Sequence, residues 1–156
     1  MEAFTLILNI DWLHVLSNLT HMAIAYVLAL PIALDRQASS RHFGLRTFPL
    51  VAVVSCGFML VGMAVIDSTD GEARVFQGII TGIGFIGGGA IFKGEDSVQG
   101  MASAASLWNT GAIGLAVAFS RFEVAIALSV LNFLTLYLLG RFKKNVDGLG
   151  EEDGDG

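Results

Sequence analysis

Charge is scarce in this sequence. Only 15% of its 156 residues are Asp, Glu, Lys or Arg, whereas 54% are hydrophobic, and the mean hydropathy is +0.68. A soluble domain of this size needs more charged surface, so the composition favours an integral membrane protein. The formal net charge of -5 gives no indication of a nucleic-acid partner, which would require a basic surface.

Cysteine is scarce in the chain, and so are acidic residues within its apolar stretches. The one cysteine, Cys56, lies in an apolar run, so a single chain can form no disulfide and no thiolate cluster. No Asp or Glu lies deep in an apolar stretch, which disfavours a Mg²⁺ pore within one subunit, because Mg²⁺ needs carboxylate or ordered carbonyl oxygens. The sequence also has no Walker loop and no nucleophile–base pair. We therefore expect neither an enzyme nor a cofactor, and metal binding stays undetermined.

Five apolar stretches of spanning length occupy most of the chain. Each has about 18–20 residues, which as a helix matches a hydrocarbon core of about 30 Å. Such stretches must be helical, because a bilayer offers no water to the backbone. We predict an all-α polytopic membrane bundle over residues 1–144, with spans at about 15–34, 48–66, 75–92, 101–119 and 122–140. The acidic, glycine-rich residues 145–156 predict a disordered tail.

The basic residues fall unevenly between these stretches. If the chain alternates through five spans, seven of its nine basic residues share one side: Arg36, Arg41, Arg46, Lys93, Arg141, Lys143 and Lys144. Arg74 and Arg121, the latter at a tight turn, lie on the other. Connections rich in Lys and Arg stay in the cytoplasm, so we predict the N-terminus outside and the C-terminus in the cytoplasm.

The third apolar stretch is unusually rich in glycine: it contains Gly78, Gly82, Gly84, Gly87, Gly88 and Gly89. On a helical wheel Gly78, Gly82 and Gly89 form one stripe, and Gly84 and Gly88 form a second beside Gln77. Small residues let membrane helices approach closely, so we predict that these glycines form a packing core and that this helix is the centre of the bundle. The alternative is that residues 87–89 loosen the helix and expose backbone groups to a ligand or ion.

Charged residues gather where the first stretch ends and the second begins, at Asp35, Arg36, Arg46 and Thr47. One interpretation is interfacial anchoring by the positive-inside rule. The other is an ion pair at the cytoplasmic mouth that gates the bundle or recognises a partner. Asp35 with Arg46 is a geometrically plausible pair.

Gln77, Asn109 and Asn132 are amides within the spans. Buried amides in a membrane usually form interhelical hydrogen bonds, and a substrate path is the alternative. A path lined by Asn109, Gln77 and Thr81 in an oligomer would favour transport. The same amides paired between helices of one chain would favour regulation.

These residues fall in three blocks that together resemble the MgtC/SapB family of bacterial inner-membrane proteins. The first block is Asp35-Arg36-Gln37 followed by Gly44-Leu45-Arg46-Thr47. The second runs from Arg74 through Gln77-Gly78 to the glycine-rich segment that ends at Gly89. The third runs from Val98-Gln-Gly100 to Trp108, then Gly111-Ala-Ile-Gly114. The resemblance covers about residues 27–118.

The sequence also departs from the family pattern. Asp35 stands where Glu is usual, Gly88 replaces Ala, Gln99 replaces Arg, and Ala102-Ser103 replaces a Thr pair. Better-studied members carry a folded cytoplasmic C-terminal domain, whereas only the short acidic tail follows the fifth stretch here. Functions that reside in that domain are therefore not carried over.

The resemblance implies a small bacterial inner-membrane protein linked to adaptation to low Mg²⁺, to acid stress and, in pathogens, to intracellular survival. It favours a modulator of other membrane machines, including the F-type ATP synthase. An oligomeric transporter or channel for Mg²⁺ or another small solute is the alternative, and a homo-oligomer stays open.

Overall fold

The computed structural model describes residues 11–39, 44–94 and 97–152, the last of these from 142 onward by backbone alone. Within these ranges the chain forms five helices and one small hairpin. The elements are α2 (Trp12–Ser39), α3 (Thr47–Val65), α4 (Thr69–Gly89), β1 (Phe92–Lys93), β2 (Val98–Gln99), α5 (Met101–Ala118) and α6 (Phe122–Glu152). The predicted all-α class is confirmed.

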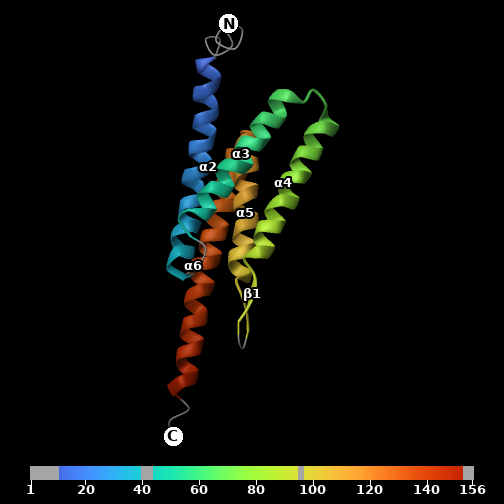
Figure 1. Ribbon diagram of the computed structural model, residues 1–156. Coiled ribbons are helices and arrows are strands. Elements are labelled where there is room, and N and C mark those ends of the chain that lie inside the picture. Colours follow the sequence, from blue (N-terminus) through green and yellow to red (C-terminus); the bar gives the residue numbers. More distant parts are fainter. Residues whose placement is uncertain (1–10, 40–43, 95–96, 153–156) are drawn as a thin grey trace.

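The helices alternate in direction along one long axis (Figure 1). The start of α2, the α3–α4 connection and the α5–α6 turn lie at one end of the bundle, and the hairpin and the last part of α6 lie at the other. Arg74 and Arg121 therefore belong to the first end, whereas Arg36, Lys93 and Arg141 belong to the second. These five basic residues fall at the ends that the five-span prediction expects, whereas Arg41 lies outside the described residues and the orientation in a membrane stays a prediction.

Three of the described helices are long and apolar enough to cross a membrane: α2, α3 and α6. The helices α4 and α5 contain more Gly, Ala, Ser and Thr, which lowers their hydropathy. Both run alongside the other three (Figure 1), so their crossing of the membrane stays a prediction that the arrangement supports.

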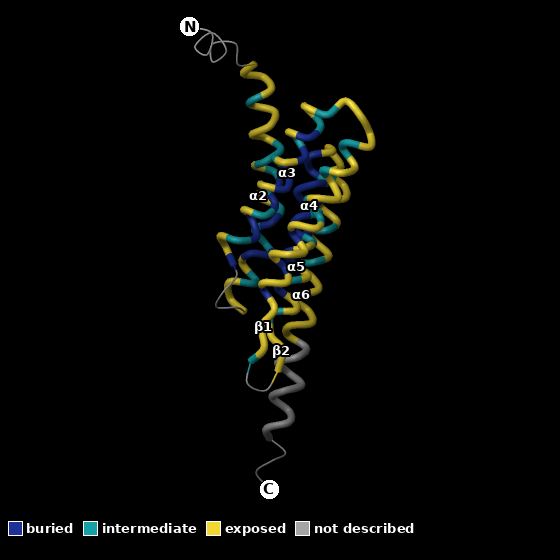
Figure 2. Tube along the Cα trace, turned by 45° about the vertical axis from the view of Figure 1, so that its right-hand side comes forward, coloured by how far each residue is buried: buried dark blue, intermediate teal, exposed yellow. Residues whose placement is uncertain are grey.

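The centre of the bundle is α5, not the glycine-rich α4 as predicted. Helix α5 packs against α2, α3, α4 and α6, whereas α4 packs chiefly against α3 and α5. Leu107, Ile113 and Val117 of α5 are fully buried. Buried positions concentrate where α3 and α5 meet, and α4 is exposed along most of its outer face (Figure 2).

Two glycines of α5 explain why this helix is central. A Cβ atom at Gly114 would collide with the Ala52 carbonyl oxygen of α3 and would lie 3.0 Å from the Ser55 Cβ. A Cβ atom at Gly111 would collide with the Ile83 side chain of α4. Small residues allow this close approach, so α5 rather than α4 supplies the close-packing surface within the chain.

Helix α4 ends at Gly89, short of the predicted end of the third span at Phe92. The Ala90 N–H donates to the Gly87 carbonyl at 3.0 Å, and the Ile91 N–H donates to the Gly88 carbonyl at 3.1 Å, which tightens the last turn. The hairpin β1–β2 follows, and Gly100 at φ 88° leads into α5. A Cβ atom at Gly100 would collide with the Ala90 carbonyl oxygen, so this turn requires glycine.

The α5–α6 connection is the tight turn that the sequence predicts near Arg121. The Ser120 N–H donates to the Val117 carbonyl at 2.9 Å, and the Arg121 N–H donates to the Ala116 carbonyl at 2.8 Å. This is a Schellman motif, with Ser120 at φ 55° in the position usually held by glycine. The Ser120 Oγ lies 3.2 Å from Nε2 of His21, which links the turn to α2.

Helix α6 continues to Glu152, through most of the segment predicted to be a disordered tail from residue 145. Extending an existing helix forms one hydrogen bond for each residue fixed, so propagation costs far less than nucleation. Residues 153–156 of the predicted tail lie outside the described residues.

We expect Gly114→Ala to lower the free energy of unfolding by about 1–3 kcal/mol, because the new methyl group overpacks the α3–α5 contact. Thermal melting in detergent measures the change. Gly140→Ala is the matched control, since a Cβ atom at Gly140 has no neighbour within 4 Å. This control is expected to raise stability slightly through helix propensity. Equal melting temperatures for the two variants would contradict the packing role of Gly114.

Candidate functional site

The charged residues predicted at the end of α2 form an ion pair, but with a different partner from the one considered. The Asp35 Oδ2 accepts from Arg36 Nη2, 2.6 Å away, and from Arg36 Nε, 3.1 Å away. Arg46 is exposed and lies just before α3. The side chains of Asp35 and Arg36 are only 15% and 11% exposed, so the two charges neutralise each other in a largely buried setting.

Gln37 joins the end of α2 to the start of α3. Its Oε1 accepts from the Leu45 N–H at 3.3 Å, and a Cβ atom at Gly44 would collide with the same side chain. The Gly44 carbonyl in turn accepts from the Thr47 N–H at 3.1 Å. The first sequence block is therefore a joint between two helices. Gln37 and Gly44 were not predicted as site residues, although both belong to that block.

The amides Asn109 and Asn132 form interhelical hydrogen bonds, as the first interpretation holds. Asn109 Nδ2 donates to the Leu128 carbonyl at 3.3 Å, and Asn132 Oδ1 accepts from Ser106 Oγ at 3.1 Å. Both bonds link α5 to α6. Ser129 Oγ adds a bond from α6 to the Leu28 carbonyl of α2, at 2.6 Å. Sequence reasoning missed Ser106 and Ser129, although serine within an apolar span is a signal for such bonds.

Gln77 lies apart from these amides. It is exposed on α4, where its backbone carbonyl accepts from Thr81 Oγ1 at 2.9 Å. Asn109 instead faces α6. The structure therefore does not bring Gln77, Thr81 and Asn109 together into one polar path within the chain.

The six glycines predicted as a packing core are mostly uncovered. Only Gly87 has a close neighbour, because a Cβ atom there would lie 3.4 Å from the Ala104 carbonyl oxygen of α5. A Cβ atom at each of the other five would have nothing within 4 Å: Gly78, Gly82, Gly84, Gly88 and Gly89. The predicted packing core is wrong within one chain, because α4 lies at the edge of the bundle and turns most of its glycines outward.

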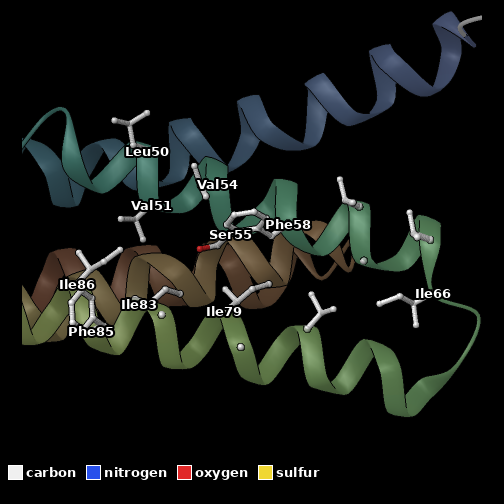
Figure 3. Close-up of a pocket in the computed structure, with 16 residues that line it drawn as sticks. Leu50, Val51, Val54, Ser55, Phe58, Ile66, Ile79, Ile83, Phe85 and Ile86 are labelled. Carbon is white, nitrogen blue, oxygen red and sulfur yellow. The ribbon is translucent and has the colours of Figure 1, made fainter. Parts of the chain in front are cut away.

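Gly78 and Gly82 border an open groove between α3 and α4, with a volume of about 840 Å³. Figure 3 shows side chains from both helices directed into it, among them Phe58 of α3 and Ile79 of α4. None of the residues that line the groove is charged, and Ser55 is the one residue with a polar side chain. The groove is thus an apolar surface that no other described part of the chain fills.

The described residues contain no group of three or more His, Cys, Asp or Glu side chains that could hold a metal ion. Cys56 is a free thiol buried in α3. The ligands of a metal, if the chain binds one, are thus not identified by this geometry.

The helical bundle, three of whose helices are apolar enough to span a bilayer, defines an all-α membrane protein. The chain belongs to the MgtC family, whose model matches residues 22–145. The matched region begins in α2 and ends in α6, so it includes the ion pair, the joint and the groove.

Three relatives illustrate this membership. SrpB of Synechococcus elongatus is 31% identical over 86% of this chain and 78% of its own length. YhiD of Escherichia coli K12, a candidate magnesium transporter by its name, is 35% identical over 67% of this chain and 52% of its own length. MgtC of Salmonella typhimurium is 33% identical over 80% of this chain and 53% of its own length. The matched region thus spans about half the length of YhiD and MgtC. No solved structure matches the chain significantly.

We expect Arg36→Gln to lower the free energy of unfolding by about 3–5 kcal/mol, because it leaves the largely buried Asp35 carboxylate without its cation. Thermal melting in detergent measures this loss, and the double variant Asp35→Asn/Arg36→Gln is expected to recover most of it. Arg46→Gln is the control, with a change within about 0.5 kcal/mol for an exposed residue. Similar melting of Arg36→Gln and Arg46→Gln would contradict the role of the pair.

Proposed function

We propose that this chain is a regulatory membrane protein that modulates another membrane complex by binding one of its transmembrane helices in the groove between α3 and α4. The groove supports this proposal because it is apolar, unfilled and bordered by Gly78 and Gly82, which have no neighbours at the Cβ position. Glycines at this position allow a second backbone to approach closely.

The dimensions of the groove suit a helix. Its lining runs along α3 from Leu50 to Val65, which is about 23 Å at 1.5 Å per residue. This length covers most of a hydrocarbon core of about 30 Å. A partner helix would therefore contact the groove over much of its transmembrane length, in the helix-in-groove mode of recognition.

The physiological setting comes from the family. Membership in the MgtC family and the resemblance described above support a bacterial inner-membrane protein linked to adaptation to low Mg²⁺ or acid stress. The same resemblance supports the F-type ATP synthase as the partner to test first. In this proposal the chain is not an enzyme, its N-terminus is outside and its C-terminus is in the cytoplasm. The basic residues at the end of the bundle where the last part of α6 lies support that orientation.

The pairing of amides also supports regulation over transport. One polar atom of each side chain, Asn109 Nδ2 and Asn132 Oδ1, forms a hydrogen bond between α5 and α6. Both side chains are thereby directed into the contact between these helices, whereas a permeation path would direct such oxygens toward the ion.

A second candidate function is transport of Mg²⁺ or another small solute, for which the exposed Gln77 is the specific observation. In an oligomer whose α4 helices face one another, Gln77 and Thr81 would line the shared surface. The relative YhiD carries the name of a candidate magnesium transporter.

The regulatory proposal predicts that filling the groove weakens the effect on the partner. Purified chain is reconstituted with F-type ATP synthase, and ATP-driven proton pumping is measured. We expect the chain to lower pumping, and the double variant Gly78→Leu/Gly82→Leu to act about tenfold more weakly, because overfilling a packed contact costs about 1–3 kcal/mol.

Gly140→Leu is the matched control, because Gly140 lies on α6, outside the groove, and is equally uncovered. It should act like the unmodified chain. Full activity of the double variant would exclude the groove as the binding surface. No effect of the unmodified chain on pumping would exclude the ATP synthase as the partner.

The transport alternative makes a separate prediction. In proteoliposomes with an imposed membrane potential, the regulatory proposal expects Mg²⁺ entry at the rate of empty liposomes, measured with an internal Mg²⁺-sensitive dye. A saturable flux that falls in the variant Gln77→Leu would favour the transporter and contradict regulation as the primary function. Verified incorporation of the protein is the control.

A further inference from the structure

A second apolar cleft lies between α4, α5 and α6, with a volume of about 620 Å³. Phe76 of α4, Trp108 and Phe119 of α5 and Leu128 of α6 are among the residues that line it. The rings of Phe76 and Phe119 lie 6.2 Å apart. This cleft differs from the α3–α4 groove in one respect, because its lining includes a charged residue, Arg121.

The cleft runs lengthwise along α5. The residues of α5 that line it recur on one face between Trp108 and Phe119, which corresponds to about 16 Å of helix. Arg121 follows Phe119 at the α5–α6 turn, where the Schellman hydrogen bonds fix its backbone. The cleft therefore has a cation at the end of the bundle and an apolar wall that extends from there toward the middle of α5.

This arrangement suits an amphiphile with an acyl chain and a phosphate. An acyl chain matches the apolar wall, and a guanidinium group binds phosphate oxygens through two parallel hydrogen bonds. Basic sites between transmembrane helices recognise lipid headgroups in this way. The α3–α4 groove has no charged residue in its lining and so offers no such selection.

The charges around Arg121 restrict the net charge of the lipid headgroup that the cleft can bind. Glu123 Oε1 lies 3.7 Å from Arg121 Nη1, and both side chains are exposed, at 67% and 72%. The same end of the bundle carries Asp67, Asp70 and Glu72 around α4, against Arg74. A net anionic headgroup would be repelled by this acidic end, whereas a zwitterionic one can pair its phosphate with Arg121 and its ammonium with Glu123.

We propose that this cleft binds one molecule of an aminophospholipid of the phosphatidylethanolamine type, with its phosphate at Arg121, its ammonium at Glu123 and one acyl chain against Trp108 and Phe119. The site is distinct from the groove of the proposed function, because the two linings share Ile83 and differ in every other residue. Lipid binding here does not depend on the regulatory proposal.

Quenching of Trp108 fluorescence by brominated lipid tests the proposal. The variant Trp12→Phe of the full chain retains Trp108 as its one tryptophan. It is placed in phosphatidylcholine vesicles in which phosphatidylethanolamine or phosphatidylglycerol with brominated acyl chains replaces part of the lipid. We expect stronger association of the brominated phosphatidylethanolamine. Arg121→Gln should weaken this association about fivefold, as expected for one basic residue at a membrane surface, and Glu123→Gln about twofold, as expected for an exposed ion pair.

Arg74→Gln is the matched control, because Arg74 lies at the same end of the bundle but outside the cleft lining. It should leave the association of phosphatidylethanolamine unchanged. Three outcomes would overturn the proposal: equal or stronger quenching by phosphatidylglycerol, no effect of Arg121→Gln, or an equal loss in Arg74→Gln. Circular dichroism of each variant confirms that the helices are retained.

Discussion

The close approach of α5 to its neighbours determines the rest of the structure. At Gly114 the backbone of α5 comes so near to the Ala52 carbonyl of α3 that no side chain fits between them, and at Gly111 the Ile83 side chain occupies the missing space. With α3 and α4 held against α5, α2 packs against α3, α5 and α6, and serine and asparagine side chains of α5 and α6 form hydrogen bonds between helices. In a bilayer, packing and such bonds replace the hydrophobic effect as the source of helix association. The shape of the bundle thus follows from small and polar residues rather than from large apolar ones.

The sequence predicts much of this fold because the bilayer restricts the choices. The apolar stretches had to be helices, and their order along the chain, the tight turn near Arg121 and the unequal distribution of Arg and Lys followed from length and charge. The neighbours of each helix did not follow. Glycines on a helix permit close packing but do not specify a partner, so Gly78 to Gly89 indicated the centre of the bundle as plausibly as Gly111 and Gly114 did. The choice depends on which glycines meet a complementary surface, such as the Ala52 carbonyl or the Ile83 side chain, and one sequence does not contain that information.

The candidate sites were predictable to a similar extent: the sequence indicated the polar residues, but it did not indicate all of their partners. Asn109 and Asn132 were recognised as polar residues within the membrane, and their interhelical role was foreseen, because an amide in an apolar span must find a partner. An ion pair at the end of α2 was one of two interpretations. Asp35 is a member of it as considered, but its partner is Arg36 rather than Arg46, because side-chain direction decides between the two arginines. The groove between α3 and α4 and the cleft between α4, α5 and α6 depend on spaces between helices and were not predicted. Phe76, Trp108 and Phe119 gave no signal of a shared cleft, since aromatic residues are common in every apolar span.

The joint between α2 and α3 has a consequence for how the protein responds to ionic strength. Asp35 and Arg36 neutralise each other, and Gln37 reaches Leu45 through a neutral hydrogen bond, so these two contacts of the joint carry no net charge. Changes in ionic strength act mainly on exposed charges, so they should have little effect on these contacts between the two helices. Exposed Arg46, which also belongs to the joint, is open to the salt and the charged groups around it. The joint thus combines neutral contacts between the two helices with an adjacent exposed charge.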